Sequence, residues 1–188
     1  MSVAPRYDTY PVDPTALARV RGNAPVHIKR SLLQILGTQT PAELFGGTLA
    51  QQLQIVEVNL VPSTHEPERV AGQVIWEVVV SENLLDARGS LDVGCFALFL
   101  DIWGTFPMIV HGMHHRPRGD NIGVSQAMQF TFHDTGATRL GARIRGDATS
   151  LAVGGRTLSA RCEMRDVDTG RLLCSGVHLK MSPSIPKL

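Results

Sequence analysis

The stretch that decides the fold is GCFALFLDIWGTF, residues 94–106, in which Asp101 is the only charged side chain. An unpaired carboxylate in an apolar site costs several kcal/mol, so Asp is almost never fully buried without a partner or a function. The segment is too long for a typical strand, contains Phe, Leu and Ala rather than Val and Thr, and follows Asp92, a residue type that caps helices. Because the segment is apolar all round, we expect a helix buried in the middle of the fold, with Asp101 placed there as an acid or base.

Length and composition suit one soluble domain with a real core, because the chain has 188 residues and is 43% hydrophobic and 19% charged. The net charge of +1 gives no electrostatic reason to expect nucleic acid or an anionic membrane as a partner. We find no apolar run of the roughly 18–20 residues that span a bilayer, and no signal peptide at the start. Three cysteines without CxxC spacing suggest reduced thiols, so we expect a cytoplasmic protein.

The patterns around the apolar segment are extended. Two runs precede it, at residues 49–62 and 70–80, and together they are typical of an antiparallel hairpin. Four more runs follow it, separated by turn residues, at 122–133, 139–152, 157–167 and 172–181. This order predicts an α+β protein whose sheet curls around one helix. An arm and helices are expected in residues 1–48, with Asp13 capping the first helix and a second helix at 26–36, and the sheet domain in residues 49–188.

Four short motifs carry a resemblance to a known family. They are the helix carboxylate Asp101, Gly123-Val124-Ser125, Gly155-Arg156-Thr157-Leu158, and the closing run Thr169-Gly170-Arg171-Leu172 followed by Gly176-Val177-His178-Leu179-Lys180. In this order and spacing the chain resembles the hotdog-fold acyl-CoA thioesterases of the phenylacetate-degradation and thioesterase-superfamily type. It departs from them in the signature nine positions before Asp101, which is His-Gly-Gly in the family and Asp92-Val93-Gly94 here.

The resemblance implies a hotdog fold and hydrolysis of a thioester. Asp101 is then the catalytic carboxylate in a mostly dry pocket, either a general base for water or a nucleophile that forms a mixed anhydride. Backbone amides at the start of the helix, around Val93 and Gly94, would polarise the thioester carbonyl. Ser125 would hold the attacking water, and Asp86 would orient it in place of the family's Asn, with Asn83 as the alternative.

The remaining predicted site residues would contact the substrate. Asp92 brings a negative charge beside the expected oxyanion, and we favour a role as helix cap for it. Val93 adds a branched side chain where the family has Gly. Arg156, His178 and Lys180 match family positions near the pantetheine and nucleotide of coenzyme A, although isolated exposed cations would give the same pattern. The resemblance implies no metal, and no cofactor beyond the coenzyme A of the substrate.

The loop after the apolar segment holds a polar cluster whose function stays open. It contains three histidines and two arginines, which are His111, His114, His115, Arg116 and Arg118. A clamp for coenzyme A phosphates is one interpretation, because Arg binds phosphate bidentately. A metal site is poorly supported, and a solvated loop is the favoured interpretation.

The expected partner is an acyl-CoA or acyl-carrier thioester together with a second copy of the chain. Six strands around one helix leave an exposed edge, which proteins seldom tolerate. Hotdog domains pair edge to edge, so we expect a homodimer or a dimer of dimers in which Asp101 of one chain faces Ser125 of the other. Two other function classes stay open: a non-catalytic acyl-binding or dimerisation module, and a hydratase or dehydratase. The second of these typically has a His beside the acid, and none occurs between His65 and His111.

Overall fold

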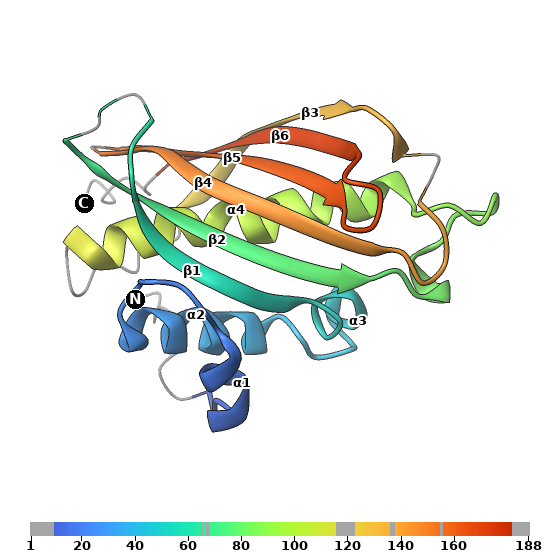
Figure 1. Ribbon diagram of the computed structural model, residues 1–188, viewed down its shortest axis with the longest axis horizontal. Helices are drawn as coiled ribbons and strands as arrows, with labels where there is room; N and C mark the ends of the chain where they lie inside the picture. Colours follow the sequence, from blue (N-terminus) through green and yellow to red (C-terminus); the bar gives the residue numbers. More distant parts are fainter. Residues whose placement is uncertain are drawn as a thin grey trace, which may run out of the picture.

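The computed structural model describes residues 10–64, 66, 68–115, 123–135, 138–154 and 156–181. In this part of the chain a six-stranded antiparallel sheet, in the order β1-β2-β4-β5-β6-β3, wraps around one long helix, α4 (Figure 1). The strands are β1 (Gln54–Pro62), β2 (Val70–Val79), β3 (Val124–Phe132), β4 (Arg143–Gly154), β5 (Thr157–Asp166) and β6 (Leu172–Met181). The helices are α1 (Pro14–Arg19), α2 (Val26–Thr38), α3 (Gly47–Ala50), the short 3₁₀ helix η2 (Glu82–Leu84) and α4 (Val93–His115). The predicted α+β class and the order of two strands, a helix and four strands are confirmed.

The elements begin and end for identifiable local reasons. Asp13 caps α1 by accepting a hydrogen bond from Thr15 N, and Pro14 occupies the first helical position, as predicted. The predicted boundary at residue 48 is not a break in structure, because α3 spans it and the first strand begins only at Gln54. The division into residues 1–48 and 49–188 stays a prediction.

Helix α4 forms the centre of the core. Its inner face carries large side chains, and Trp103 stacks on Trp76 of β2 with ring centroids 5.3 Å apart. Gly146 on β4 makes this possible, since a Cβ there would lie 2.0 Å from the Trp76 ring. By length and composition α4 is long enough to cross a membrane, contrary to our expectation, but most of its apolar window is buried inside this fold. Its apolar sequence therefore follows from its central position.

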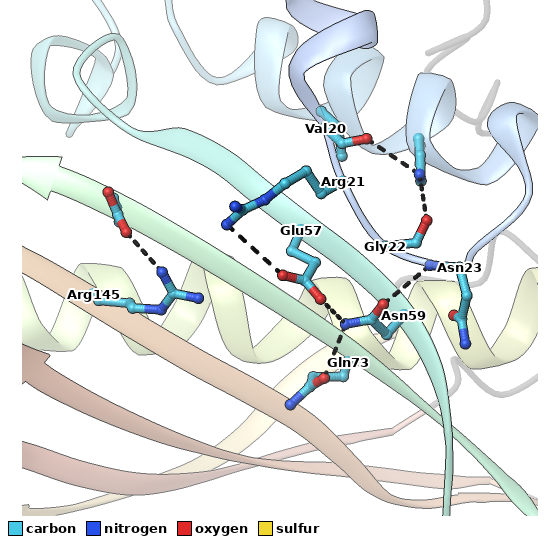
Figure 2. A network of polar contacts seen from close by, with 10 residues as sticks. Val20, Arg21, Gly22, Asn23, Glu57, Asn59, Gln73 and Arg145 are labelled. Carbon is cyan, nitrogen blue, oxygen red and sulfur yellow. Dashed lines mark hydrogen bonds and ion pairs between the residues drawn. The ribbon is translucent and has the colours of Figure 1, made fainter.

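The outer edge of β1 is covered by the N-terminal segment, whose residues Arg21 and Asn23 lie beside Glu57 and Asn59 (Figure 2). Arg21 N donates to Val56 O and Val58 N donates to Arg21 O, both at 3.0 Å, so this segment adds a short parallel bridge beside β1. The Asn23 side chain continues the cover, because its Oδ1 accepts from Leu60 N at 2.7 Å and its Nδ2 donates to Leu60 O at 2.9 Å. These contacts satisfy backbone groups that an edge strand would otherwise expose.

The opposite edge, formed by β3, has no such cover in the described part of the chain. β3 pairs with β6 on one side, and no described strand pairs with its other side. Eight of its nine residues are exposed, including the large apolar side chains Val124, Met128 and Phe132. The sheet therefore ends in one protected edge and one open, partly apolar edge.

Candidate active site

Three polar side chains from three elements meet beside the outer face of α4. Ser125 Oγ, at the start of β3, donates to Asp101 Oδ1 at 3.0 Å. His178 Nε2, on β6, lies 2.9 Å from Ser125 Oγ and 3.6 Å from Asp101 Oδ1. Because the single Ser125 proton goes to Asp101, His178 Nε2 donates to Ser125 Oγ, and the network runs from His178 to Ser125 to Asp101.

His178 is completely buried and neutral. Its side chain has no exposed area, and burial, helped by the nearby cation of Lys180, lowers its pKa to about 4. The other ring nitrogen, Nδ1, is buried and makes no hydrogen bond of good geometry among the described residues, although the ring interacts with the Leu100 main-chain carbonyl, which opposes the fall in its pKa. A neutral ring that donates through Nε2 agrees with the bond from Ser125 to Asp101. His178 therefore orients the Ser125 hydroxyl and cannot itself meet a substrate.

Lys180 is buried on the same face of β6. Its Nζ donates to Thr105 Oγ1 at 3.0 Å, and Thr105 Oγ1 donates to the Asp101 main-chain carbonyl at 2.7 Å. Burial lowers the pKa of Lys180, and the Asp101 carboxylate opposes this shift. Thr105 was not predicted as a site residue. Its position four residues after Asp101 is the signal that would have indicated it, because residues four apart are neighbours on a helix.

Three expectations about these residues are wrong. Ser125 contacts Asp101 within one chain, so the pair does not need a dimer interface to meet, because β3 joins the sheet beside β6 of its own chain. His178 and Lys180, which we expected to contact the substrate, are instead buried next to Asp101, because their strand presents them to α4. Asp101 itself is not buried, since 45% of its side-chain area is accessible in the single chain.

The accessibility of Asp101 comes from a stripe of α4 that the sheet leaves uncovered. Every side chain on this stripe is exposed or half-buried, and its members are Val93, Gly94, Ala97, Leu98, Asp101 and Ile102. The stripe joins the start of the helix to the Asp101 carboxylate along one face. Asp101 and the helix N-terminus therefore lie on one accessible face of α4.

At the start of the helix the predicted oxyanion amide is already used. Gly94 N donates to Asp92 Oδ1 at 2.7 Å, so Asp92 is the helix cap, as we favoured. Val93, at the first helical position, has an amide with no acceptor in the described part of the chain. Val93 N is therefore the amide without a recorded acceptor at this end, and Gly94 N becomes available only when Asp92 moves away.

The structure does not bring Asp86 to Asp101. The Asp86 carboxylate accepts from Arg88 N, from the Arg88 guanidinium and from Ser90 N, which closes its own loop. The Arg88 guanidinium is the main cause of its lowered pKa. The alternative residue, Asn83, accepts hydrogen bonds from Ser81 and Gln52 beside η2. Neither residue has a recorded contact with the Asp101 network.

Arg156 is exposed in the turn between β4 and β5. The register places Thr157 opposite Met181 and Met181 opposite Val124, so Arg156 lies at the end of the sheet where Ser125 lies. In the polar cluster after α4, His111, His114 and His115 belong to the helix, and their rings contact one another. Arg116 and Arg118 lie outside the described residues. Among the described residues no group of three or more His, Cys, Asp or Glu side chains is placed to hold a metal ion.

Comparison with known proteins finds matches by structure but none by sequence. No protein-family model matches the sequence, and no curated protein matches it. Solved structures match it clearly. Zebra fish thioesterase superfamily member 2 superposes with a TM-score of 0.65 at 20% identity, over 81% of this chain and 96% of that chain.

Two further matches are bacterial. A hypothetical thioesterase from Streptococcus pneumoniae TIGR4, solved with coenzyme A, superposes with a TM-score of 0.56 at 12% identity, over 73% of this chain and 90% of that chain. The E. coli PaaI protein from the phenylacetic acid degradation operon superposes with a TM-score of 0.51 at 12% identity, over 60% and 73%. The sequence motifs resemble two types of protein, thioesterase superfamily members and phenylacetate-degradation proteins, and both types are among the structural neighbours. The chain has the hotdog fold that these proteins share.

Proposed function

We propose that the protein is an acyl thioesterase that hydrolyses an acyl-CoA or acyl-carrier thioester. The observation that carries this proposal is the network of Asp101, Ser125 and His178. Its carboxylate, Asp101, lies on the exposed stripe of α4. A carboxylate reachable from solvent and backed by an oriented hydroxyl can hold a water molecule and accept its proton, an effect worth about 10²–10⁴-fold in rate. The coenzyme A bound to the Streptococcus pneumoniae thioesterase supports an acyl-CoA substrate.

The reaction assigns a separate task to each end of the stripe. Water held by Asp101 and Ser125 attacks the thioester carbonyl, Asp101 accepts the proton, and the C–S bond then breaks to release the thiol. The developing oxyanion is stabilised by backbone N–H groups at the helix N-terminus, where Val93 N has no recorded acceptor in the described part of the chain. Asp101 as a nucleophile would give the same products through an anhydride.

A second copy of the chain completes the proposed site. Val93 and Asp101 are eight residues apart on one helix, which is about 12 Å at about 1.5 Å per residue. Each catalytic contact spans about 3 Å, so the two groups do not converge on one carbonyl within a single chain. A two-fold dimer formed through the open β3 edges can bring the helix N-terminus of one chain to Asp101 of the other. This proposal keeps a shared site but corrects which residues the two chains contribute.

One observation favours a non-catalytic acyl-binding module instead. Asp92 occupies the Gly94 amide and brings a negative charge to the place where an oxyanion would form. A hydratase is disfavoured because the histidine near Asp101 is completely buried. A cytoplasmic location remains part of the proposal, and the three cysteines Cys95, Cys162 and Cys174 are all unpaired.

The test is thiol release from a panel of short, long and aromatic acyl-CoA thioesters, with Asp101→Asn purified in parallel as the background. Isothermal titration with the same thioesters measures binding. Release above the background from at least one thioester supports hydrolysis. Binding of a thioester with no release above the background contradicts hydrolysis and identifies the protein as a binding module.

A further inference from the structure

Lys180 is a buried cation to which the proposed chemistry assigns no task. Only 5% of its surface is accessible, whereas lysines are almost never buried without a partner. The recorded acceptor for its Nζ among the described residues is a neutral hydroxyl, Thr105 Oγ1, rather than a carboxylate. Burying a charge this way costs stability, so its position calls for a function.

The contacts of Lys180 lead to Asp101 by two routes. Through Thr105, which hydrogen-bonds the Asp101 carbonyl, Lys180 ties this turn of α4 to β6. Through space, its charge interacts with the Asp101 carboxylate and with His178, two residues along the same strand. The register adds Ser125 of β3 and Leu158 of β5 as neighbours, both uncharged.

We propose that Lys180 is a positioning residue, which through Thr105 fixes the turn of α4 that carries Asp101 and places a positive charge beside the network of His178, Ser125 and Asp101. This inference rests on the proposed thioesterase function for its kinetic test, although not for its spectroscopic one. A cation close to a histidine disfavours the imidazolium. The Lys180 charge therefore helps to keep His178 in the neutral form that hydrogen-bonds Ser125.

Two substitutions separate the two routes. Lys180→Met removes the charge and the hydrogen bond while keeping a long side chain that suits a buried site. Thr105→Val removes the hydroxyl and leaves the charge in place. Both variants are compared with the wild-type full chain in its native oligomer, by kcat and KM across pH and by NMR titration of the His178 ring.

We expect Lys180→Met to lower kcat at least about tenfold with little change in KM. The midpoint of the His178 titration should rise from its low wild-type value, because the neighbouring cation is gone. Thr105→Val should lower kcat less and leave the His178 midpoint in place. A purely structural role would lower stability without moving the His178 midpoint.

The inference is overturned if Lys180→Met leaves the His178 midpoint at its wild-type value. If no thioester is hydrolysed by the wild type, the proposed function fails, and the His178 titration still decides the inference. If Lys180→Met does not fold, Thr105→Val decides it: a lower kcat at unchanged KM supports the positioning role, and an unchanged kcat contradicts it.

Discussion

The two ends of the exposed α4 stripe differ in how complete they are. At the carboxylate end, Asp101, Ser125 and His178 come from three elements and already form a connected network in one chain. At the amide end, Gly94 N is occupied by Asp92, and Val93 N has no recorded acceptor in the described part of the chain. One chain therefore builds the water-activating half of the proposed site, while in our proposal the half that stabilises the oxyanion depends on a second chain and on Asp92.

The largest expected effect comes from disrupting the proposed dimer, which would separate the two ends of the site. Gln129→Glu combined with Thr131→Glu places carboxylates along the open β3 edge, where two copies of the chain would repel each other. Thr131 is six residues from Ser125, about 20 Å along the strand, so the change is remote from Asp101. We expect a monomer by sedimentation whose thiol release is at least about 10²-fold below wild type, because the oxyanion donors of the second chain are lost.

Thr131→Val is the matched control for the double variant, and it should stay dimeric and active. A monomeric double variant that keeps full activity would show that both ends act within one chain. That result would contradict the shared site.

A smaller effect is expected from substitutions of Asp92, at the amide end of the stripe. Asp92→Gly should free the Gly94 amide, remove the charge and cost only a few tenths of a kcal/mol as a cap, so kcat should rise by up to about tenfold. Asp92→Asn keeps an acceptor for Gly94 N and removes only the charge, so its gain should be smaller. An equal fall of kcat in both variants would mean that the capped conformation is the active one.

The last expected effect is on stability rather than on rate, and it arises at the carboxylate end of the stripe. The pKa of His178 falls from 6.5 to about 4 on folding, so the unfolded chain binds more protons between these values, and stability is lost as pH falls through this window. We expect the free energy of unfolding to fall by about 3 kcal/mol between pH 6.5 and 4 on account of this residue. His178→Asn keeps a donor for Ser125 and should lack this component in urea unfolding. Identical pH slopes would contradict the buried, neutral ring.

The sequence predicted the fold well because its strongest signals are local. An all-round apolar segment indicated the central helix, and runs bounded by Gly, Asp and Pro indicated the strands, whose observed bounds differ from the predicted ones by a few residues. The start of β1 was predicted too early because Leu49 and Ala50 are buried in α3 rather than in a strand. The protected β1 edge was not predicted, because Arg21 and Asn23 reach Val58 and Leu60 only through the tertiary fold.

The site was predicted in its members but not in its geometry. Asp101 was expected to be buried, but the curved sheet leaves its stripe of α4 open. The composition of a helix does not tell which stripe that will be. His178 and Lys180 were expected to contact the substrate, although their spacing of two in β6, in step with the buried Cys174, carries the signal of an inward face. The alternation of the strand was here a better guide than the resemblance.

The proposal that Asp101 activates water for thioester hydrolysis is tested best by the substitution Asp101→Asn. On the thioester that the wild type hydrolyses fastest, kcat and KM are compared for wild type and Asp101→Asn. We expect a fall in kcat of about 10²–10⁴-fold with KM changed by no more than about threefold, because the substitution removes the proton acceptor and keeps the shape of the side chain. An Asp101→Asn variant with wild-type kcat would contradict the activation of water by Asp101.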